Sequence, residues 1–528
     1  METDLIGTSI IGFSRGGKTA ETFTAFDPAS GNTVEPVFHS ATNDELEIAA
    51  KLADEARLSY AAAAPVKRAA FLRSIADNIE SLGDTLIKRA SLETALPNAR
   101  FEGERARTCF QLRMFADVLE EGSWVEARID HAIPDRQPLP KPDVRSMLRP
   151  IGPVAVFCAS NFPLAYSVAG GDTASALAAG CPVIVIGHTA HPGTAELVGI
   201  AVSKAVRDHQ MPEGTFSLLF SAGYEMGQAL VRHSAIKAVG FTGSRKGGRA
   251  LMDFAAARPE PIPIYTEMSS VNPTFLLPNA IKERGNDIAK GLHASVTTGA
   301  GQFCTKPGLV FLPNDADSFV ANFNSQIEQT TPPPLLTGGI RAAYVAGNLK
   351  RAGEVDNTAA NEEAQLPGFA VNPSAFETTA IEYLNMPDLN EEIFGPTTLL
   401  IRSGEKEELL RIARALEGQL TASVHGTEED LAEYADLIAI LETKAGRLIF
   451  NGFSTGVEVC PSMVHGGPYP ATSDGRSTAV GSRAITRFAR LVCYQNFPQS
   501  ALPNELKDEN PQNIRRMVDG QVCQNRER

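Results

Sequence analysis

Short apolar runs that alternate with longer amphipathic stretches dominate the middle of this 528-residue chain. Four runs have the length and the branched apolar content of buried strands, at 154–158, 182–186, 216–220 and 236–241. Helical patterns follow them, at 169–179, 192–206, 225–233 and after Ser244. This alternation predicts an α/β fold with a parallel sheet that is covered on both faces and binds ligands at the carboxyl ends of its strands.

Ahead of this region the pattern predicts a short strand pair and then helices. Turn residues between positions 24 and 31 indicate two strands joined by a turn. Thr42 and Glu45 have the spacing of a capping box, so we expect a helix to begin there. Two further helices are predicted, one opened by Pro65 and a longer one at about 97–121.

The second half of the chain resumes the α/β alternation, with two segments that stand apart. A helix capped by Thr427 is predicted to run to about Leu441, and a strand is predicted at 447–450. The segment 129–150 contains closely spaced prolines, which exclude a helix and a central strand and predict an extended excursion. The polar tail from Lys507 is expected to be peripheral or flexible.

Composition limits the class of protein. A chain that is 43% hydrophobic and 21% charged can bury a large core, and its length predicts two or three closely associated domains. Its formal net charge of −14 argues against a nucleic-acid partner, because phosphate binding depends on clustered Lys and Arg. A soluble metabolic protein is the expectation that fits these values.

The sequence offers no signal for a membrane, an oxidising compartment or a metal. Glu2 and Asp4 stand where a secretory signal would be positively charged, and the longest apolar run, 173–187, is interrupted by Gly180 and Pro182. The seven cysteines are an odd number without a Cys-x-x-Cys pair, and the nine histidines show no ligand spacing. We therefore expect a cytoplasmic protein without a metal site or membrane contact, in which the histidines, His465 among them, are structural.

The candidate chemistry centres on Cys304, which lies in a run of small residues and glycines from 299 to 305. Such a run can hold a thiol on a bend that is open to a substrate, and Glu267 precedes it in an apolar neighbourhood. Cys304 is therefore a candidate nucleophile and Glu267 its candidate base. Most cysteines are small buried hydrophobes, however, and an isolated acid is often a salt-bridged structural residue, so these two residues alone do not decide the function.

Two further positions follow predicted strands. Asn161, after the strand at 154–158, could donate its side-chain amide to an oxyanion, although an Asn before Phe-Pro is otherwise an ordinary turn residue. Gly243 and Ser244 join the strand at 236–241 to a helix, a position suited to a phosphate. They do not form a Gly-x-Gly-x-x-Gly fingerprint, and by themselves they would indicate a plain strand-to-helix turn.

Five motifs together support a catalytic role for these candidate residues. They lie at 159–163, 241–248, 267–270, 301–304 and 391–396. Their residues, order and rough spacing resemble those of the aldehyde dehydrogenase superfamily. The runs 450–453 and 465–474 are more particular. They resemble the branch that contains 2,5-dioxovalerate (α-ketoglutaric semialdehyde) dehydrogenases and NADP-preferring bacterial aldehyde dehydrogenases.

This resemblance implies an aldehyde dehydrogenase-like architecture with three parts and a tail. We expect a Rossmann-type cofactor domain at 1–128 and 148–266 and an α/β catalytic domain at 267–480. We also expect an oligomerisation arm at 129–147 and 481–500 and a C-terminal tail at 501–528. A homodimer or homotetramer is implied as well. The loop 466–470 is expected to line the substrate tunnel, although its Gly and Pro content alone would indicate a surface turn.

The resemblance also implies roles for individual residues. Cys304 would attack the aldehyde, Asn161 and the Cys304 N–H would hold the oxyanion, and Glu267, its pKa raised by an apolar surround, would activate the hydrolytic water. The remaining implied contacts are to a nicotinamide cofactor. Gly243, Ser244 and Gly248 would line its pyrophosphate, Glu392 would bind the nicotinamide ribose, and Phe394 would pack by the nicotinamide.

The cofactor-binding pattern departs from the family at three positions. Ile186 stands where the family normally has a Lys that contacts the adenosine ribose. Thr189 occupies the place of a ribose-binding Glu in NAD-preferring relatives, and the missing carboxylate removes repulsion of a 2′-phosphate. Tyr224 stands where NADP-preferring relatives have an Arg. We therefore expect NADP as the cofactor, with NAD possible.

The expected activity is NAD(P)-dependent oxidation of an aldehyde to an acid, with 2,5-dioxopentanoate, which gives 2-oxoglutarate, as the first choice of substrate. One alternative is a broad fatty or aliphatic aldehyde dehydrogenase. A CoA-acylating enzyme is disfavoured, since it would need no hydrolytic base at Glu267. A different class of alternative, suggested by Ile186, is a non-catalytic binding protein that retains the fold.

Overall fold

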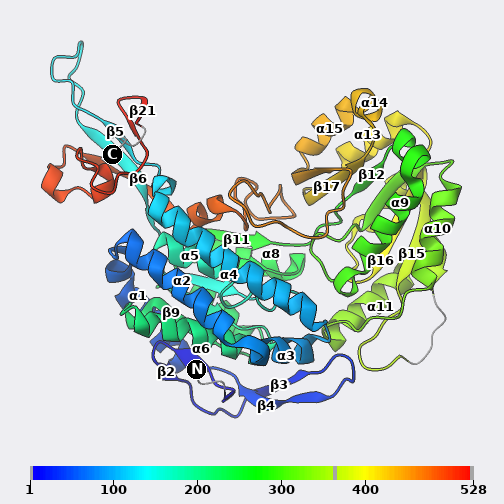
Figure 1. Ribbon diagram of the computed structural model, residues 1–528, viewed down its shortest axis with the longest axis horizontal. Helices are drawn as coiled ribbons and strands as arrows, with labels where there is room; N and C mark the ends of the chain where they lie inside the picture. The colour runs from blue at the N-terminus through cyan, green and yellow to red at the C-terminus, as the bar shows by residue number, and fades with distance from the viewer. Residues whose placement is uncertain (1–3, 361–365, 524–528) are drawn as a thin grey trace.

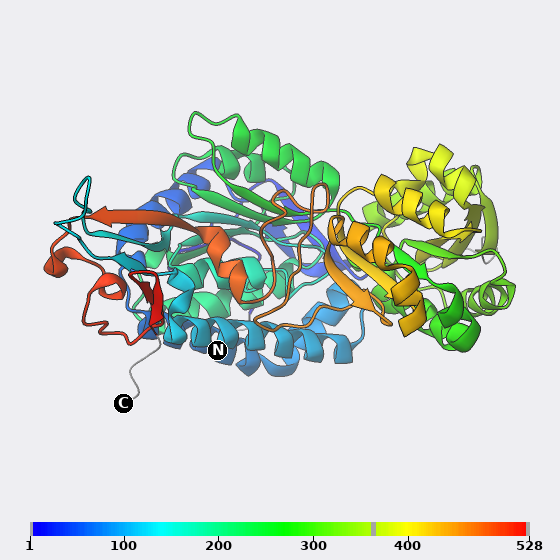
Figure 2. The same ribbon diagram turned by 90° about the horizontal axis from the view of Figure 1, so that it is seen from above.

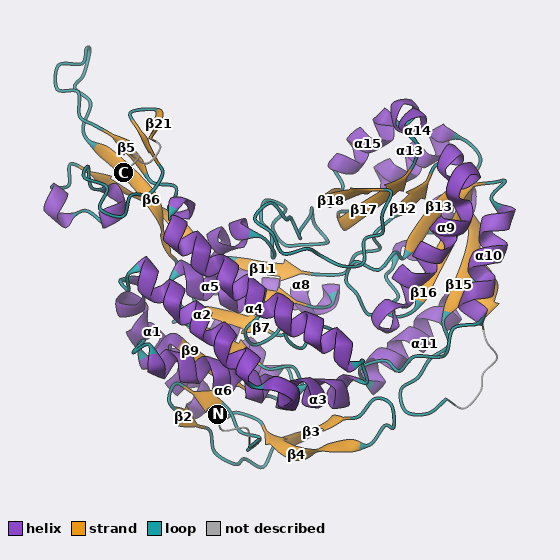
Figure 3. Ribbon diagram, in the orientation of Figure 1, coloured by secondary structure: helices purple, strands orange, loops and turns teal. Residues whose placement is uncertain are grey.

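Three multi-stranded sheets organise the computed structural model, which describes residues 4–360 and 366–523 (Figures 1 and 3). Within these residues, two seven-stranded sheets form the two larger bodies, and a five-stranded sheet projects from one end of the molecule. A hairpin of β3 (Thr22–Phe26) and β4 (Thr33–His39) lies beside the first body. The predicted α/β class is confirmed.

The first sheet has the order β11-β10-β7-β8-β9-β1-β2. Its strands are β11 (Ile264–Glu267), β10 (Ala238–Thr242), β7 (Val154–Phe157), β8 (Val183–Ile186), β9 (Phe216–Leu219), β1 (Ile10–Ile11) and β2 (Ser14–Arg15). The strands from β11 to β9 are parallel to one another. At the other edge, β1 is antiparallel to both β9 and β2. All four strands predicted from the apolar runs are therefore present, and they are neighbours in one sheet.

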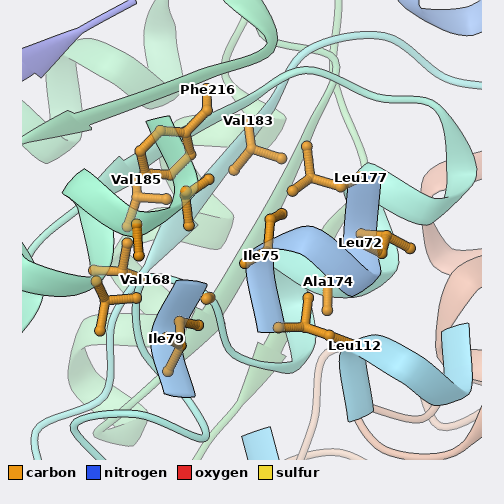
Figure 4. Close-up of a cluster of buried hydrophobic side chains, with 14 of the residues drawn as sticks. Leu72, Ile75, Ile79, Leu112, Val168, Ala174, Leu177, Val183, Val185 and Phe216 are labelled. Carbon is orange, nitrogen blue, oxygen red and sulfur yellow. The ribbon is translucent and has the colours of Figure 1, made fainter. Parts of the chain in front are cut away.

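Alternate residues of these strands face two different helical layers, because side chains on a strand point to opposite faces in turn. Val183 belongs to the core cluster beneath one layer (Figure 4), and so does Val154. Ala155 and Ile184 belong to the cluster on the opposite face. The first layer contains α2 (Pro65–Ser81), α3 (Gly83–Thr94), α4 (Asn98–Glu121), α5 (Gly171–Ala179) and α6 (Pro192–Asp208). The second contains α1 (Asn43–Ala61), α7 (Glu225–Arg232) and α8 (Arg245–Ala256).

The second sheet is parallel except for its first edge strand and has the order β14-β15-β16-β13-β12-β17-β18. Its strands are β14 (Asp356–Ala360), β15 (Ser374–Thr379), β16 (Thr397–Ser403), β13 (Leu309–Pro313), β12 (Thr274–Leu276), β17 (Gln419–His425) and β18 (Ala445–Phe450). One face packs on α9 (Pro278–Thr297) and α10 (Asp317–Glu328). The other packs on α12 (Ala380–Asn385), α13 (Lys406–Ala415) and α15 (Ala435–Glu442). The helix α11 (Gly338–Ala352) lies between the two bodies (Figure 1).

Local signals located the helix starts well. Thr42 and Glu45 form the predicted capping box, with Glu45 N donating to Thr42 Oγ1 and Thr42 N donating to Glu45 Oε2. Thr427 likewise caps α14 (Glu428–Glu433), but the predicted single helix to Leu441 is wrong. The helix breaks at Tyr434, whose φ of −100° and ψ of 27° are not helical, and α15 continues from there.

The projecting sheet corrects the prediction for 129–150. Its order is β19-β6-β5-β20-β21, with β19 (Ala489–Gln495), β6 (Val144–Pro150), β5 (Arg128–Asp130), β20 (Arg516–Val518) and β21 (Gln521–Cys523). Proline was expected to exclude a central strand, yet β6 pairs with β19 on one side and β5 on the other. The prolines are concentrated in the connection before β6, and from Val144 the chain again has the N–H groups that a ladder needs.

The tail is peripheral, as predicted, but it is folded rather than loose (Figure 2). Leu506 and Ile514 are buried in one cluster with Ile129 and Met147 of the projecting sheet and with Val125, which precedes that sheet. The polar composition concealed a few apolar anchors, which is sufficient to dock a short segment. No helix among residues 4–360 and 366–523 has the length and apolar character needed to cross a bilayer.

We predict that Ile514→Ala loosens the docked tail without unfolding the rest of the chain. Emptying this buried site is expected to lower the free energy of local opening by about 2–4 kcal/mol. Hydrogen–deuterium exchange of the β20 and β5 amides measures the change. Val522→Ala, in the same segment but 49% exposed, is the matched control and should change the free energy by less than about 0.5 kcal/mol. Equal protection in the two variants would contradict the docking.

Candidate active site

Cys304 is positioned by an unusual turn that follows α9. Gly299, Ala300 and Gly301 all have positive φ, at 58°, 59° and 66°. A Cβ on Gly301 would lie 2.4 Å from the carbonyl carbon and oxygen of Gly395, so glycine is required there by both conformation and space. The glycines flanking the thiol thus form a bend, as the sequence predicted, and the bend is packed against the loop that contains Glu392 and Phe394.

A buried amide connects this turn to the segment after β11. Asn272 Nδ2 donates to Cys304 O at 2.8 Å and to Lys306 O at 3.0 Å. Glu267 is the last residue of β11 and lies five positions before this amide, so the thiol loop is fixed beside the carboxylate. The sulfur and the carboxylate, which the sequence predicted to act together, are brought to one place.

A third side chain completes the cluster. His465 Nε2 lies 2.8 Å from Glu267 Oε1 and 3.6 Å from Cys304 Sγ, and all three ligand atoms lie within 4.8 Å of one another. Atoms this close could share a metal ion, although the sequence predicts none. The sequence analysis expected His465 to be structural and did not predict its contacts with Glu267 and Cys304. The available signal was its place at the start of the distinctive run 465–474.

The cluster shifts the pKa of two of its members. Burial, the largest effect, raises the pKa of the Glu267 carboxyl, but the charge and the hydrogen bond of His465, together with smaller effects of Cys304 and Arg487, leave that pKa below its ordinary value. The expected increase in an apolar surround is therefore wrong. Burial and the neighbouring Glu267 carboxylate raise the pKa of the Cys304 thiol well above its ordinary value. At neutral pH the free protein thus holds a carboxylate and a protonated thiol.

Asn161 lies in the loop after β7 and reaches the same point. Its Nδ2 donates to Gln302 O at 2.8 Å, which fixes the amide beside the cysteine turn. A primary amide has two N–H groups, so a second donor is available for another acceptor. Asn161, Glu267 and Cys304, distant in the sequence, line one cavity of about 750 Å³.

This cavity lies at the carboxyl ends of β7, β10 and β11 and is the natural place for the expected cofactor. Four predicted cofactor residues line it, namely Gly243, Ser244, Glu392 and Phe394. Ser244 is the N-cap of α8 and accepts from Gly247 N, so the amino end of that helix is directed at the cavity. A dinucleotide therefore fits the residues present: a helix terminus for phosphate and a carboxylate, Glu392, for a ribose.

The other two predicted cofactor residues lie outside the cavity lining. Gly248 is buried in α8, where an added Cβ would lie 2.7 Å from Met268. Thr189 lies partly exposed in the turn after β8. Ile186, which ends β8, is also absent from the lining, whereas Tyr224 lines it with 85% of its surface exposed. The close packing of Gly248 shows why a small residue is needed there, independently of any ligand.

Glu392 is held in an unusual environment for a carboxylate. Burial raises its pKa to about 7, against the opposing effect of the nearby Lys306 ammonium. Burial also lowers the pKa of Lys306, whose Nζ donates to Ile393 O at 3.0 Å and Thr397 O at 2.7 Å. Lys306, two residues after Cys304, therefore connects the cysteine loop to the loop that contains Glu392 through its hydrogen bonds.

A second cavity, of about 340 Å³, also has Cys304 in its wall. Its polar and aromatic lining includes Arg100, Arg107, Phe162, Tyr166 and Phe303. The helix that supplies both arginines was predicted, but nothing in its periodicity distinguished them from solvated surface charges. Cys304 is thus the point at which the two cavities meet.

Comparison with known proteins agrees with this geometry. The sequence model of the family described as "Aldehyde dehydrogenase family" matches residues 15–468. Alpha-ketoglutaric semialdehyde dehydrogenase 2 of Azospirillum brasilense is 49% identical over 523 residues, covering 98% of this chain and 99% of that protein. Alpha-ketoglutaric semialdehyde dehydrogenase of Acinetobacter baylyi is 44% identical over 524 residues, with 98% and 99% coverage.

Solved structures show the same fold. An NAD⁺ complex of aldehyde dehydrogenase from Bacillus cereus superposes with a TM-score of 0.79 at 21% identity, covering 92% of this chain and 96% of that one. PnpE in complex with nicotinamide adenine dinucleotide gives a TM-score of 0.78 at 21% identity, with 93% and 97% coverage. With the family match over most of its length and two near-complete relatives above 40% identity, this chain belongs to the aldehyde dehydrogenase family.

Proposed function

We propose that this enzyme oxidises 2,5-dioxopentanoate to 2-oxoglutarate through a thioester on Cys304, with NADP as its preferred nicotinamide cofactor. The observation that supports the proposal best is the position of Cys304 between the two cavities, one suited to a dinucleotide and the other small and lined by arginines. The names of the two near-complete relatives favour the same substrate. The absence of a carboxylate at Thr189 favours NADP over NAD.

The first step is attack by sulfur. The thiol proton of Cys304 passes to the neighbouring Glu267 carboxylate, whose lowered pKa returns it to solvent, as the Cys304 sulfur forms a bond to the aldehyde carbon. The carbonyl electron pair moves to oxygen, and the free N–H of Asn161 donates to the oxyanion that results. The carbon is now tetrahedral and can release a hydride, for which a bound nicotinamide cofactor would be the acceptor. Cys304 is left as a thioester.

The second half of the reaction depends on Glu267. Its Oε2 is buried without a hydrogen-bond partner among the described residues, whereas Oε1 is held by His465. The lowered pKa keeps the carboxylate ionised, so Oε2 can accept a proton from a water that attacks the thioester. The new C–O bond forms, the C–S bond breaks with its electron pair on sulfur, and the acid is released. Asn161 again donates to the oxyanion.

The proposal includes the larger organisation expected from the sequence. The cofactor domain would comprise 1–128 with 148–266, the catalytic domain 267–480, the arm 129–147 with 481–500, and the tail 501–528. The three separate sheets support a division into three main bodies, although β6 (Val144–Pro150) crosses the boundary at 147/148 and the tail strands β20 and β21 belong to the sheet of the arm. Assembly through the arm into a homodimer or homotetramer, and a location in the cytoplasm, belong to the same proposal.

We predict that Cys304→Ala and Glu267→Gln fail at different steps. Cys304→Ala should abolish reduction of the nicotinamide at 340 nm, because the tetrahedral adduct cannot form. Glu267→Gln should lower the steady-state rate by about 10²–10⁴ while a covalent adduct accumulates on Cys304. Mass spectrometry of the intact chain during turnover detects that adduct. Full steady-state activity in Cys304→Ala, or a Glu267→Gln enzyme without adduct, would contradict the assigned roles.

We predict that alkylation of Cys304 in the free enzyme is slow at neutral pH and still rises with pH above 9. The thiolate is the reactive form, and the raised pKa keeps its fraction small below the ordinary thiol range. Iodoacetamide labelling followed by peptide mass spectrometry gives the rate at each pH, with the exposed Cys493 as an internal reference. A Cys304 rate that reaches its plateau below pH 8 would show that the thiol is already activated.

We predict that Thr189→Glu changes cofactor choice. A carboxylate near the adenosine ribose repels a 2′-phosphate, so kcat/KM with NADP should fall about tenfold or more while kcat/KM with NAD is maintained. Steady-state kinetics with each nicotinamide and the same aldehyde give both values. Thr189→Gln, of nearly equal size but uncharged, is the control and should lose less with NADP. An equal effect of the two variants would exclude charge as the cause.

A further inference from the structure

We propose that Arg107, assisted by Arg100, is the binding site for the carboxylate of the aldehyde substrate, and that these two residues set the enzyme's specificity for acid-bearing aldehydes. The inference rests on the proposed function and adds residues to it. It starts from the second cavity, whose lining contains Arg100, Arg107 and Cys304.

Helix geometry places the two arginines on one face. Arg100 and Arg107 are seven residues apart on α4, which is two turns, so their side chains leave the helix in nearly the same direction. Gly103 lies between them and also lines the cavity, and a Cβ added there would meet nothing within 4 Å. The missing side chain leaves open space between the two guanidinium groups.

The charges in this cavity do not balance. The Glu104 carboxylate is already satisfied, because Oε1 accepts from Leu164 N at 2.9 Å and Ala165 N at 3.0 Å, and Oε2 accepts from Arg100 Nε at 3.2 Å. Arg107 has no carboxylate within 4.0 Å among the described residues, and its Nη2 donates to the hydroxyl of Tyr166 at 3.3 Å. The lining therefore has one positive charge in excess.

Two donors in this cavity lack acceptors. Arg100 Nη2 and Arg107 Nε are buried without a hydrogen-bond partner in the part of the chain that is described. A buried unpaired donor costs about 1–3 kcal/mol, and more when the group is charged. A ligand carboxylate would supply acceptor oxygens to these donors and neutralise the excess charge, and arginine is the residue that binds carboxylates best.

Aromatic rings fix the direction of both guanidinium groups. Arg100 lies 4.4 Å from the ring centroid of Phe162 and 4.8 Å from that of Phe303, and Arg107 lies 5.3 Å from that of Tyr166. Phe303 directly precedes Cys304, so the position of Arg100 is linked to the position of the nucleophile. The carboxylate end and the aldehyde end of one substrate can thus be held at the same time.

The ligand that fits is a short aldehyde with a carboxylate at its far end. A long alkyl chain would cover the unpaired guanidinium nitrogens without offering them an acceptor, which is unfavourable in a buried site. The volume of about 340 Å³ is at the small end of the range for small-molecule sites. Both observations oppose a fatty aldehyde as the preferred substrate.

The test is Arg107→Met assayed with 2,5-dioxopentanoate and with pentanal, a neutral aldehyde of the same length. We expect kcat/KM for the acid to fall about 10–100-fold, mainly through KM, as for a lost charged hydrogen-bonding partner, while kcat/KM for pentanal is unchanged or higher. Arg107→Lys should lie between parent and Arg107→Met for the acid. Arg105→Met is the matched control, since Arg105 is on the same helix but donates to Gly83 O outside the cavity.

A second measurement does not depend on turnover. Glutarate should protect Cys304 from iodoacetamide in the parent and in Arg105→Met, and protection should be lost in Arg107→Met. Equal loss of activity for both aldehydes, or glutarate protection retained in Arg107→Met, would overturn the carboxylate site. A parent enzyme that oxidises pentanal but not 2,5-dioxopentanoate would instead overturn the proposed substrate, while the glutarate result would still decide the site. Circular dichroism and the thermal midpoint confirm that each variant is folded.

Discussion

The hydrogen bonds of one buried amide, that of Asn272, hold together the segments that contain the proposed catalytic residues. Its Nδ2 donates to the carbonyls of Cys304 and Lys306, and its Oδ1 accepts from Thr421 in the second sheet. Gln419 Oε1 in turn accepts from Val271 N and Asn272 N. A buried polar network of this kind is stable only when every member is satisfied, and it therefore allows a single arrangement. That arrangement fixes the cysteine loop relative to β11 and, through β11, to the first sheet.

In the candidate active site built on this frame, Glu267, His465 and Cys304 alter one another's protonation. The Glu267 carboxylate disfavours a thiolate at Cys304, and His465 contacts both groups. In the free protein the negative charge therefore resides on the carboxylate and the sulfur keeps its proton. A nucleophile that is protonated at rest is protected from oxidation and from chance electrophiles, since the thiolate is the form that reacts with both. Activation then requires the proton to be moved within the cluster when substrate is present.

The sequence allowed prediction where the determining interactions are local. The apolar runs located β7 to β10 and the Thr-x-x-Glu signal located α1, because strand burial and helix capping act over a few residues. Prediction from the sequence failed where the determining contacts join residues that are far apart along the chain. The central place of β6 depends on β19, more than 300 residues later, and docking of the tail depends on a few anchors such as Ile514. Arg107 gave no local signal for the same reason, and the position of His465 in the run 465–474 did not by itself predict its contact with Glu267 or its effect on the pKa of that carboxyl.

The separation of Glu267 and His465 along the chain has a consequence for biosynthesis. The two residues are 198 positions apart, and the segment after His465 pairs with β11 through a bridge between Glu267 and Thr472. A nascent polypeptide still attached to the ribosome can fold its first sheet and even present its cysteine loop before this segment has emerged. It cannot yet contain the His465 contact. Completion of this cluster therefore waits for the segment around His465, and a chain truncated before it would have the thiol and the carboxylate without the imidazole between them.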